Sequence, residues 1–171
     1  TGSSYKVWLP LPRLASGNLL VEGTESRSRL GNQPGSIIDE ELQSAVVTFD
    51  GQPAKEDWFA VTLDVPVAVR RVVYMHGKNF HDGGWFDTSA GKPRVQIQRE
   101  RNGAWETIGE LADYPATTST NNANLKSGQA FTLKLESPVE ALAVRVVGVP
   151  ASGDNPRQSF SSCAELQAFA P

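Results

Sequence analysis

Short runs of alternating apolar and polar residues, separated by clusters of turn-forming residues, recur through most of this 171-residue chain. No long segment shows the 3.6-residue periodicity of an amphipathic helix, whereas alternation with a period of two is typical of half-buried strands. Many short strands with polar turns indicate an all-β fold, an antiparallel β-sandwich or barrel. The runs predict strands over residues 18–23, 44–49, 57–65, 68–77, 94–100, 104–111, 130–136, 141–149 and 163–169.

The pair Asn102-Gly103 is the clearest local turn signal. It lies between two of the predicted strands, and Asn-Gly tolerates the positive φ angles of a tight hairpin turn. In such a hairpin, Val95 and Ile97 face one side of the sheet and the glutamines beside them face the other.

Prolines and polar clusters mark where the strands end. Pro66 and Pro138 lie between predicted strands, and they indicate strand junctions because proline cannot donate to a ladder. Long polar loops on a sheet scaffold are where binding groups usually lie. The stretches without strand character are residues 22–36, 76–93, 112–128 and 150–160.

Charge and cysteine content exclude several classes of function. With 16 Lys and Arg against 19 Asp and Glu, the chain has no basic field for nucleic acid or anionic lipid, so we expect no nucleic-acid partner. The apolar runs are too short for a membrane span, so we expect no membrane insertion. Cys163 is the single cysteine; it cannot form an intrachain disulfide or a Cys-based zinc site, and we interpret it as a small buried hydrophobe.

Five motifs stand in an order that points to a known family. They are PGSIIDEELQS (34–44), DWFAVTLDVPVAVRRVVY (57–74), KPRVQIQRERNGAWETI (92–108), ALAVRVVGV (141–149) and SSCAELQAF (161–169). In this order they resemble the F5/8 type C (discoidin) family, and within it the bacterial family 32 carbohydrate-binding modules. The resemblance implies an antiparallel β-sandwich of the galactose-binding-like jelly-roll type over residues 16–171. Residues 1–15 would then be an N-terminal extension or linker.

The segment FHDGGWFD, within the second long loop, carries side chains suited to a sugar. Paired glycines let neighbouring rings point outward, so we expect Trp85 and Phe86 to offer a stacking face for the apolar C–H side of a saccharide. The alternative is that one of the two rings closes the end of the sandwich beneath the loop. Polar groups that would bond the sugar hydroxyls are His81, Asp82 and Asp87.

The resemblance adds further candidate ligand residues, because the family builds its sugar site from loops at one end of the sandwich. His76 lies where the family carries an arginine, and this substitution argues against assuming a simple galactose specificity. Phe160 falls where the family often places a stacking aromatic. Arg29 and Asn32 lie in the first loop, which often adds a polar contact.

A metal site is also implied by the resemblance. The family often holds a structural Ca²⁺ between the loop before the second strand and the glutamate of the closing strand, here Asp39, Ser44 and Glu165 with backbone carbonyls. The alternative is that Asp39 caps a turn and Glu165 is an exposed strand residue. A zinc site is disfavoured, because the five-residue spacing of His76 and His81 suits neither a strand nor a helix.

These features favour a non-catalytic carbohydrate-binding module that targets a larger bacterial enzyme or surface protein to glycans. Its partners would be a carbohydrate and the parent polypeptide, and its location secreted, cell-surface or periplasmic. The chain has no Gly-x-Ser-x-Gly, HExxH or phosphate-loop motif. Two other classes stay open: an interaction or structural β-sandwich, in which Trp85 and Phe86 would be buried or lie on a flat apolar patch, and a small glycan-active enzyme with two facing carboxylates. Trp58 and Trp105 are expected to be core or sheet residues.

Overall fold

The computed structural model describes residues 17–31 and 34–171. The predicted extension, residues 1–15, and the candidate ligand residue Asn32 lie outside the described residues. Within the described part of the chain, no helix is long and apolar enough to cross a membrane. The elements are the 3-10 helix η1 (Leu19–Glu22) and the strands β1 (Thr24–Arg27), β2 (Val46–Val47), β3 (Asp57–His76), β4 (Phe86–Asp87), β5 (Arg94–Gln98), β6 (Trp105–Glu110), β7 (Ala130–Pro150) and β8 (Ser162–Phe169).

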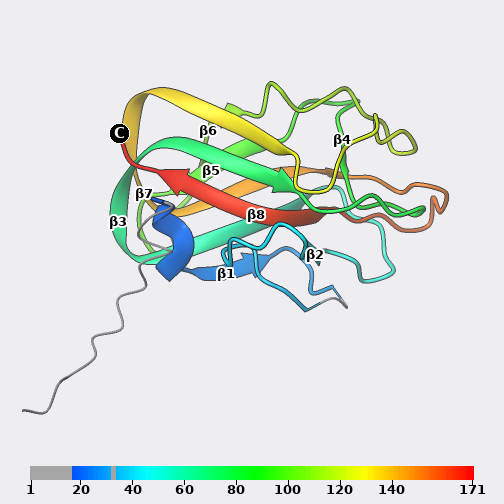
Figure 1. Cartoon of the computed structure of the whole chain (residues 1–171), viewed down its shortest axis with the longest axis horizontal. Coiled ribbons are helices and arrows are strands. Elements are labelled where there is room, and N and C mark those ends of the chain that lie inside the picture. The colour runs from blue at the N-terminus through cyan, green and yellow to red at the C-terminus, as the bar shows by residue number, and fades with distance from the viewer. Residues whose placement is uncertain (1–16, 32–33) are drawn as a thin grey trace, which may run out of the picture.

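Two long strands, β3 and β7, run through both layers of the sandwich. They pair with each other before and after a bend, with a register shift between Thr62 and Val67. Pro66 lies in that break and Pro138 lies between two paired stretches of β7, so the predicted junctions are bends within continuous strands. Figure 1 shows both strands bending at the end of the molecule where the C-terminus lies.

The two layers share the halves of these bent strands. The first half of β3 pairs with β1 and β7, and β7 carries β5 and then β6. The second half lies between β7 and β8, and β8 carries β2. All of these pairings are antiparallel, which confirms the predicted β-sandwich.

Side chains from both layers meet in one core. Val95 and Ile97 face the same side of the sheet, as predicted, and are fully buried in this core; Cys163 is buried among the same apolar residues. Burial raises the pKa of the Cys163 thiol, which agrees with an unreactive packing role. The hairpin after β5 turns through Asn102, whose φ is 61°, but its loop covers residues 99–104 and is longer than a two-residue turn.

The N-terminal region differs from the sequence prediction. Residues 18–23, predicted as a strand, contain η1, because the Asn18 side chain caps the helix by accepting from the N–H of Leu20 over 3.1 Å. Strand β1 then forms inside a stretch predicted as loop, where it pairs with residues 59–62 of β3. The polar composition of β1 concealed it, since its side chains are exposed or half-buried.

Candidate functional site at the loop end

Four loops meet at the end of the sandwich opposite the two bends (Figure 1). Backbone hydrogen bonds join them: Gly153 N–H donates to Ser119 O over 2.7 Å, and Asp154 N–H donates to His81 O over 2.9 Å. The N–H of Ser159 also donates to the carbonyl of a residue in the loop after β2. The fold therefore brings together residues 48–56, 77–85, 111–129 and 151–161.

Trp85 and Phe86 are buried, so the prediction that they form the stacking face is wrong, and their burial is the outcome expected for an interaction or structural β-sandwich. Their exposed fractions are 2% and 0%. The indole Nε1–H of Trp85 donates to Thr118 O over 2.8 Å, and Phe86 packs among core aromatics. The paired glycines serve close packing instead: a Cβ on Gly84, whose φ is 109°, would lie 2.3 Å from Lys78 O. The chain can thus fold tightly under the loop and turn both rings inward.

His76 and Phe160 are also buried, with exposed fractions of 0% and 3%, so neither can contact a ligand as predicted. Asn79 donates its Nδ2–H to Leu125 O, which directs Oδ1 to the ring of His76 at 2.8 Å from Nε2. Nε2 therefore carries the proton, while Nδ1 has no partner among the described residues. Burial lowers the pKa of His76 to about 4, so the ring is neutral at pH 7.

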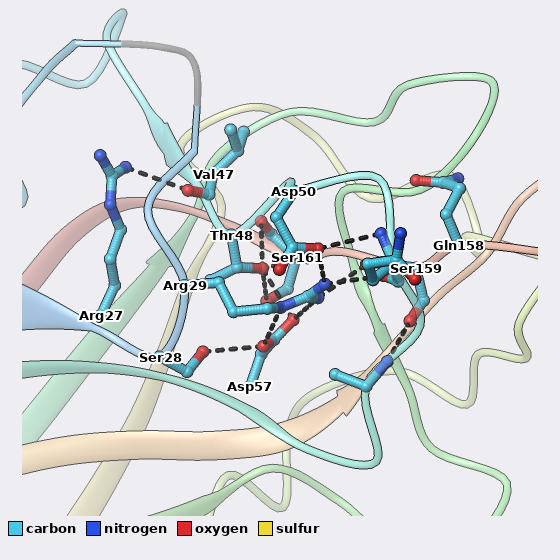
Figure 2. A network of polar contacts seen from close by, with 12 residues as sticks. Arg27, Ser28, Arg29, Val47, Thr48, Asp50, Asp57, Gln158, Ser159 and Ser161 are labelled. Atoms are coloured by element: carbon cyan, nitrogen blue, oxygen red, sulfur yellow. Dashed lines mark hydrogen bonds and ion pairs between the residues drawn. The ribbon is translucent and has the colours of Figure 1, made fainter.

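Arg29 holds the fold and cannot bind a ligand, because all five of its N–H donors are used (Figure 2). Nε and Nη2 donate to the two carboxylate oxygens of Asp57, at 3.0 and 2.5 Å. Nη1 donates to Asp50 at 2.6 Å and to Gln52 O at 2.7 Å. Nη2 also donates to Ser159 O at 2.7 Å. The predicted role of Arg29 in sugar binding is therefore wrong.

Three of the predicted polar ligand residues remain at or near the surface. His81 has an exposed side chain, with Nδ1 2.9 Å from Asp154 Oδ2 and Nε2 3.9 Å from Asp82 Oδ1. The hydrogen bond and charge of Asp154, with the charge of Asp82, raise the pKa of His81. Asp87 is half-buried and accepts from the N–H and hydroxyl of Ser89, so it bonds within its own loop. His81 and Asp82 thus stay as candidates at the loop end.

Phe49 and Phe80 are the aromatic residues that sequence reasoning missed. Both are half-buried and pack on Phe160, with ring centroids 5.2 and 5.5 Å away from it. Phe80 lies in the FHDGGWFD segment, but alternation and composition do not tell which ring of that segment reaches the rim. Exposed polar residues on the four loops include Asp50, Gln52, Lys78, His81, Asp154, Asn155 and Arg157. The loop end therefore combines two partly exposed ring faces with charged and amide groups.

The three residues predicted to bind calcium lie together beside the loop before β2. Glu165 is fully buried, which excludes the alternative of an exposed strand residue. Its Oε1 accepts from Glu40 N–H over 2.7 Å, and its Oε2 has no partner among the described residues. Ser44 Oγ lies 3.3 Å from Asp39 Oδ2. Burial, with a further contribution from the neighbouring Asp39 side chain, raises the pKa of Glu165 to about 9.

This cluster fits calcium better than a metal that needs several strong ligands. The described residues contain no group of three or more His, Cys, Asp or Glu side chains placed to hold a metal ion. A cation here would have the carboxylates of Asp39 and Glu165, the hydroxyl of Ser44 and carbonyl oxygens such as Glu41 O, 3.2 Å from Ser44 Oγ. Calcium accepts such mixed oxygen ligands, and a buried carboxylate oxygen without a donor is a position where a cation is favourable.

Comparison with known proteins places the fold. No family model matches the chain, and no curated protein matches its sequence. A family 32 carbohydrate-binding module from NanJ of Clostridium perfringens, solved with galactose, has a TM-score of 0.63 at 18% identity, over 89% of this chain and 97% of that one. The chain has the fold of these modules.

Two further structures agree. The module CpGH89CBM32-5 of C. perfringens, solved with GalNAc-β-1,3-galactose, gives a TM-score of 0.64 at 18% identity, over 90% of this chain and 99% of that one. A chitosan-binding module from a chitosanase/glucanase of Paenibacillus sp. IK-5 gives 0.59 at 16% identity, over 89% and 98%. The fold implied by the order of sequence motifs is therefore confirmed.

Proposed function

We propose that this protein is a non-catalytic carbohydrate-binding module that holds a parent bacterial enzyme or surface protein on a glycan outside the cytoplasm. The observation that carries the proposal is the pair of half-buried rings, Phe49 and Phe80, at the loop end of the sandwich. Modules with this fold were solved with galactose and with GalNAc-β-1,3-galactose, which supports a carbohydrate as the ligand class.

The chemistry of the loop end matches what a pyranose presents. A sugar has an apolar C–H face, which packs on an aromatic ring, and a rim of hydroxyls, which needs convergent donors and acceptors. Phe80 would supply the ring, while the ammonium of Lys78 and the paired His81 and Asp154 would supply the polar contacts. Because Lys78, His81 and Asp154 are exposed and would have to be ordered by the sugar, we expect affinities in the micromolar to millimolar range.

A glycan array followed by affinity electrophoresis tests this proposal on the full chain. Phe49→Ala and Phe80→Ala should each weaken binding by roughly three- to tenfold, the loss expected for one stacking ring. Phe169→Ala is the matched control: that ring lies at the opposite end of the sandwich, 4.0 Å beneath the Arg71 guanidinium, and its loss should leave binding unchanged. A blank array, or binding that survives both loop-end changes, would contradict the proposal and favour an interaction module without sugar affinity.

We further infer that Asp39, Ser44 and Glu165 hold a structural Ca²⁺. The buried Glu165 Oε2, which has no donor among the described residues, supports this inference. When bound, the ion would supply the positive charge that keeps Glu165 ionised in a buried position. Through the ion, Asp39 and Ser44 in the loop before β2 would be held to Glu165 in β8.

Thermal unfolding in Ca²⁺ and in chelator tests the metal. At about 100 times its dissociation constant, the ion should raise the melting temperature of the chain by roughly 5 to 10 °C. Glu165→Gln should remove this response, while Glu110→Gln, on the exposed strand β6, should keep it. The same melting temperature in Ca²⁺ and in chelator would show that the cluster binds no calcium.

A further inference from the structure

The outer face of the sheet formed by β3, β7, β5 and β6 carries two tryptophans around one arginine. Trp58 lies on β3, Arg145 on β7 and Trp105 on β6. The Arg145 guanidinium lies 4.2 Å from the ring centroid of Trp105 and 5.5 Å from that of Trp58. Both indoles are half-buried and belong to the face of the sheet that is turned away from the core.

Arg145 keeps most of its hydrogen-bonding capacity unused. Its Nε–H donates to Gln96 Oε1 over 2.8 Å. Among the described residues, no carboxylate forms an ion pair with Arg145, whereas Arg94 pairs with Glu56 on the same layer. Four N–H donors of Arg145 thus lack a protein partner in the described chain, in contrast to Arg29, whose five donors are all satisfied.

A shallow hollow of about 320 Å³ continues this face at one side. It is lined by two cations and two carboxylates, Lys92, Arg94, Glu56 and Glu110, and by residues 90–91 and 147–149, so the free positive charge of the face lies at Arg145 and not in the hollow. Val147 is the register partner of both Trp58 and Arg94, so the hollow and the tryptophans lie on neighbouring positions of one surface. The surface therefore runs from the hollow, across Trp58 and Arg145, to Trp105.

We propose that this outer face binds an acidic glycan, a chain that contains uronate residues. The planar guanidinium of Arg145 matches a carboxylate through two parallel N–H···O bonds. The two indoles beside it offer apolar surface for the C–H faces of neighbouring pyranoses and lower the solvation of the guanidinium. Gln98 and Thr107, on neighbouring strands, supply amide and hydroxyl partners. This site is separate from the loop end and does not depend on it.

The geometry favours a saccharide over an acidic peptide. The backbone groups of β7 and β5 are already paired in the sheet, so only side chains are available around Arg145. An extended peptide that paired with the free edge of β6 would lie three strand spacings, ~14 Å, from Arg145. A glycan needs no backbone pairing and can lie directly across the face.

Titration calorimetry of the full chain with hexagalacturonate tests the proposal, with cellohexaose as the neutral probe and hexaglutamate as the acidic peptide. Hexagalacturonate should bind and the other two should not. Arg145→Gln should weaken binding at least about tenfold. Arg145→Lys keeps the charge but loses the two parallel N–H donors of the guanidinium, and it should weaken binding several-fold. Arg99→Gln is the matched control because it removes one positive charge from the same layer, where Arg99 pairs with Glu106, and it should change binding less than about twofold.

Phe80→Ala separates this site from the loop end, since it should leave hexagalacturonate binding unchanged. Melting curves of each variant confirm that it is folded. The proposal is overturned by the absence of hexagalacturonate binding, by an equal loss in Arg99→Gln, or by equally tight binding of hexaglutamate. Binding that is lost in Phe80→Ala but kept in Arg145→Gln would assign the acidic glycan to the loop end instead.

Discussion

Phe160 lies beneath Phe49 and Phe80, and this layering decides which rings can meet a ligand. A ring that closes the end of the core has no free face, whereas the two rings that cover it are partly exposed. Residue type could not separate these roles, because Gly83 and Gly84 are compatible with an outward or an inward course of the loop. The inward course depends on a distant acceptor, the Thr118 carbonyl, which captures the indole N–H of Trp85.

His76 should make the protein sensitive to acid. Its pKa is about 4 in the folded protein against 6.5 for the ordinary side chain, so the unfolded chain takes up the proton first. The contribution of His76 to stability is present above pH 6.5 and is lost as the pH falls toward 4. Linkage gives a loss of about 2 kcal/mol in the free energy of unfolding between pH 7 and pH 5. Urea unfolding of the chain and of His76→Gln at both pH values measures it.

The comparison with His76→Gln is needed because the contribution of Glu165 to the free energy of unfolding changes with pH in the opposite direction to that of His76. In the metal-free protein, the raised pKa of Glu165 gives stability that is present below about 4.5 and lost as the pH rises toward about 9. This contribution is the same in the chain and in His76→Gln, so the difference between them isolates the histidine. His81→Gln, at an exposed position, should keep the acid loss of the chain. An identical pH dependence in His76→Gln and the unchanged chain would refute the assignment.

At the scale of elements, one carboxylate ties three segments together. Asp57, the first residue of β3, is fully buried and accepts from Ser28 Oγ at 2.7 Å and Thr48 Oγ1 at 2.8 Å, as well as from Arg29 (Figure 2). These donors come from the segment after β1 and the segment after β2. Through Ser159, Arg29 extends the network to the loop before β8, so the loop end is fixed from several elements.

Removal of this carboxylate should therefore destabilise the fold. Asp57→Ala leaves the Arg29 guanidinium and two hydroxyls without their acceptor, and we expect a loss of about 3 to 5 kcal/mol in the free energy of unfolding. Asp50→Asn is the control, since Asp50 contacts the same arginine from an exposed position and should cost less than about 1 kcal/mol. Equal losses in urea unfolding would show that burial of Asp57 is not the source of the stability.

Local sequence signals predicted most elements but not their connection in space. Alternation located β5, β6 and β8, and proline located the bends of β3 and β7, because these signals act within a few residues. The order of strands depends on pairings such as Asp57 with Gly148, which no local signal specifies. The candidate site followed the same rule: three of its four loops, residues 77–85, 111–129 and 151–161, were predicted, whereas residues 48–56 were not and the predicted loop 22–36 contains β1. The inward or outward direction of each side chain depended on partners from distant segments.

For the whole molecule, the sandwich separates two surfaces. The bends of β3 and β7 close one end, and the loops at the other end carry Phe49 and Phe80 (Figure 1). The outer face with Arg145 is a second, independent surface. If both surfaces bind glycans, a polymer that reaches both would be held more tightly than either site alone allows, because the second contact becomes intramolecular.

The most direct test of the central claim is an NMR titration of the labelled chain with the glycan that gives the strongest array signal. The account predicts that the backbone amides of residues 49–52, 78–82, 152–155 and 157–158 shift together and saturate with one dissociation constant. Amides near Pro66 and Pro138, at the bends, should not move. Shifts confined to the bends, or to the layer formed by β2, β8 and the second half of β3, with the loop-end amides unchanged, would contradict the proposed site.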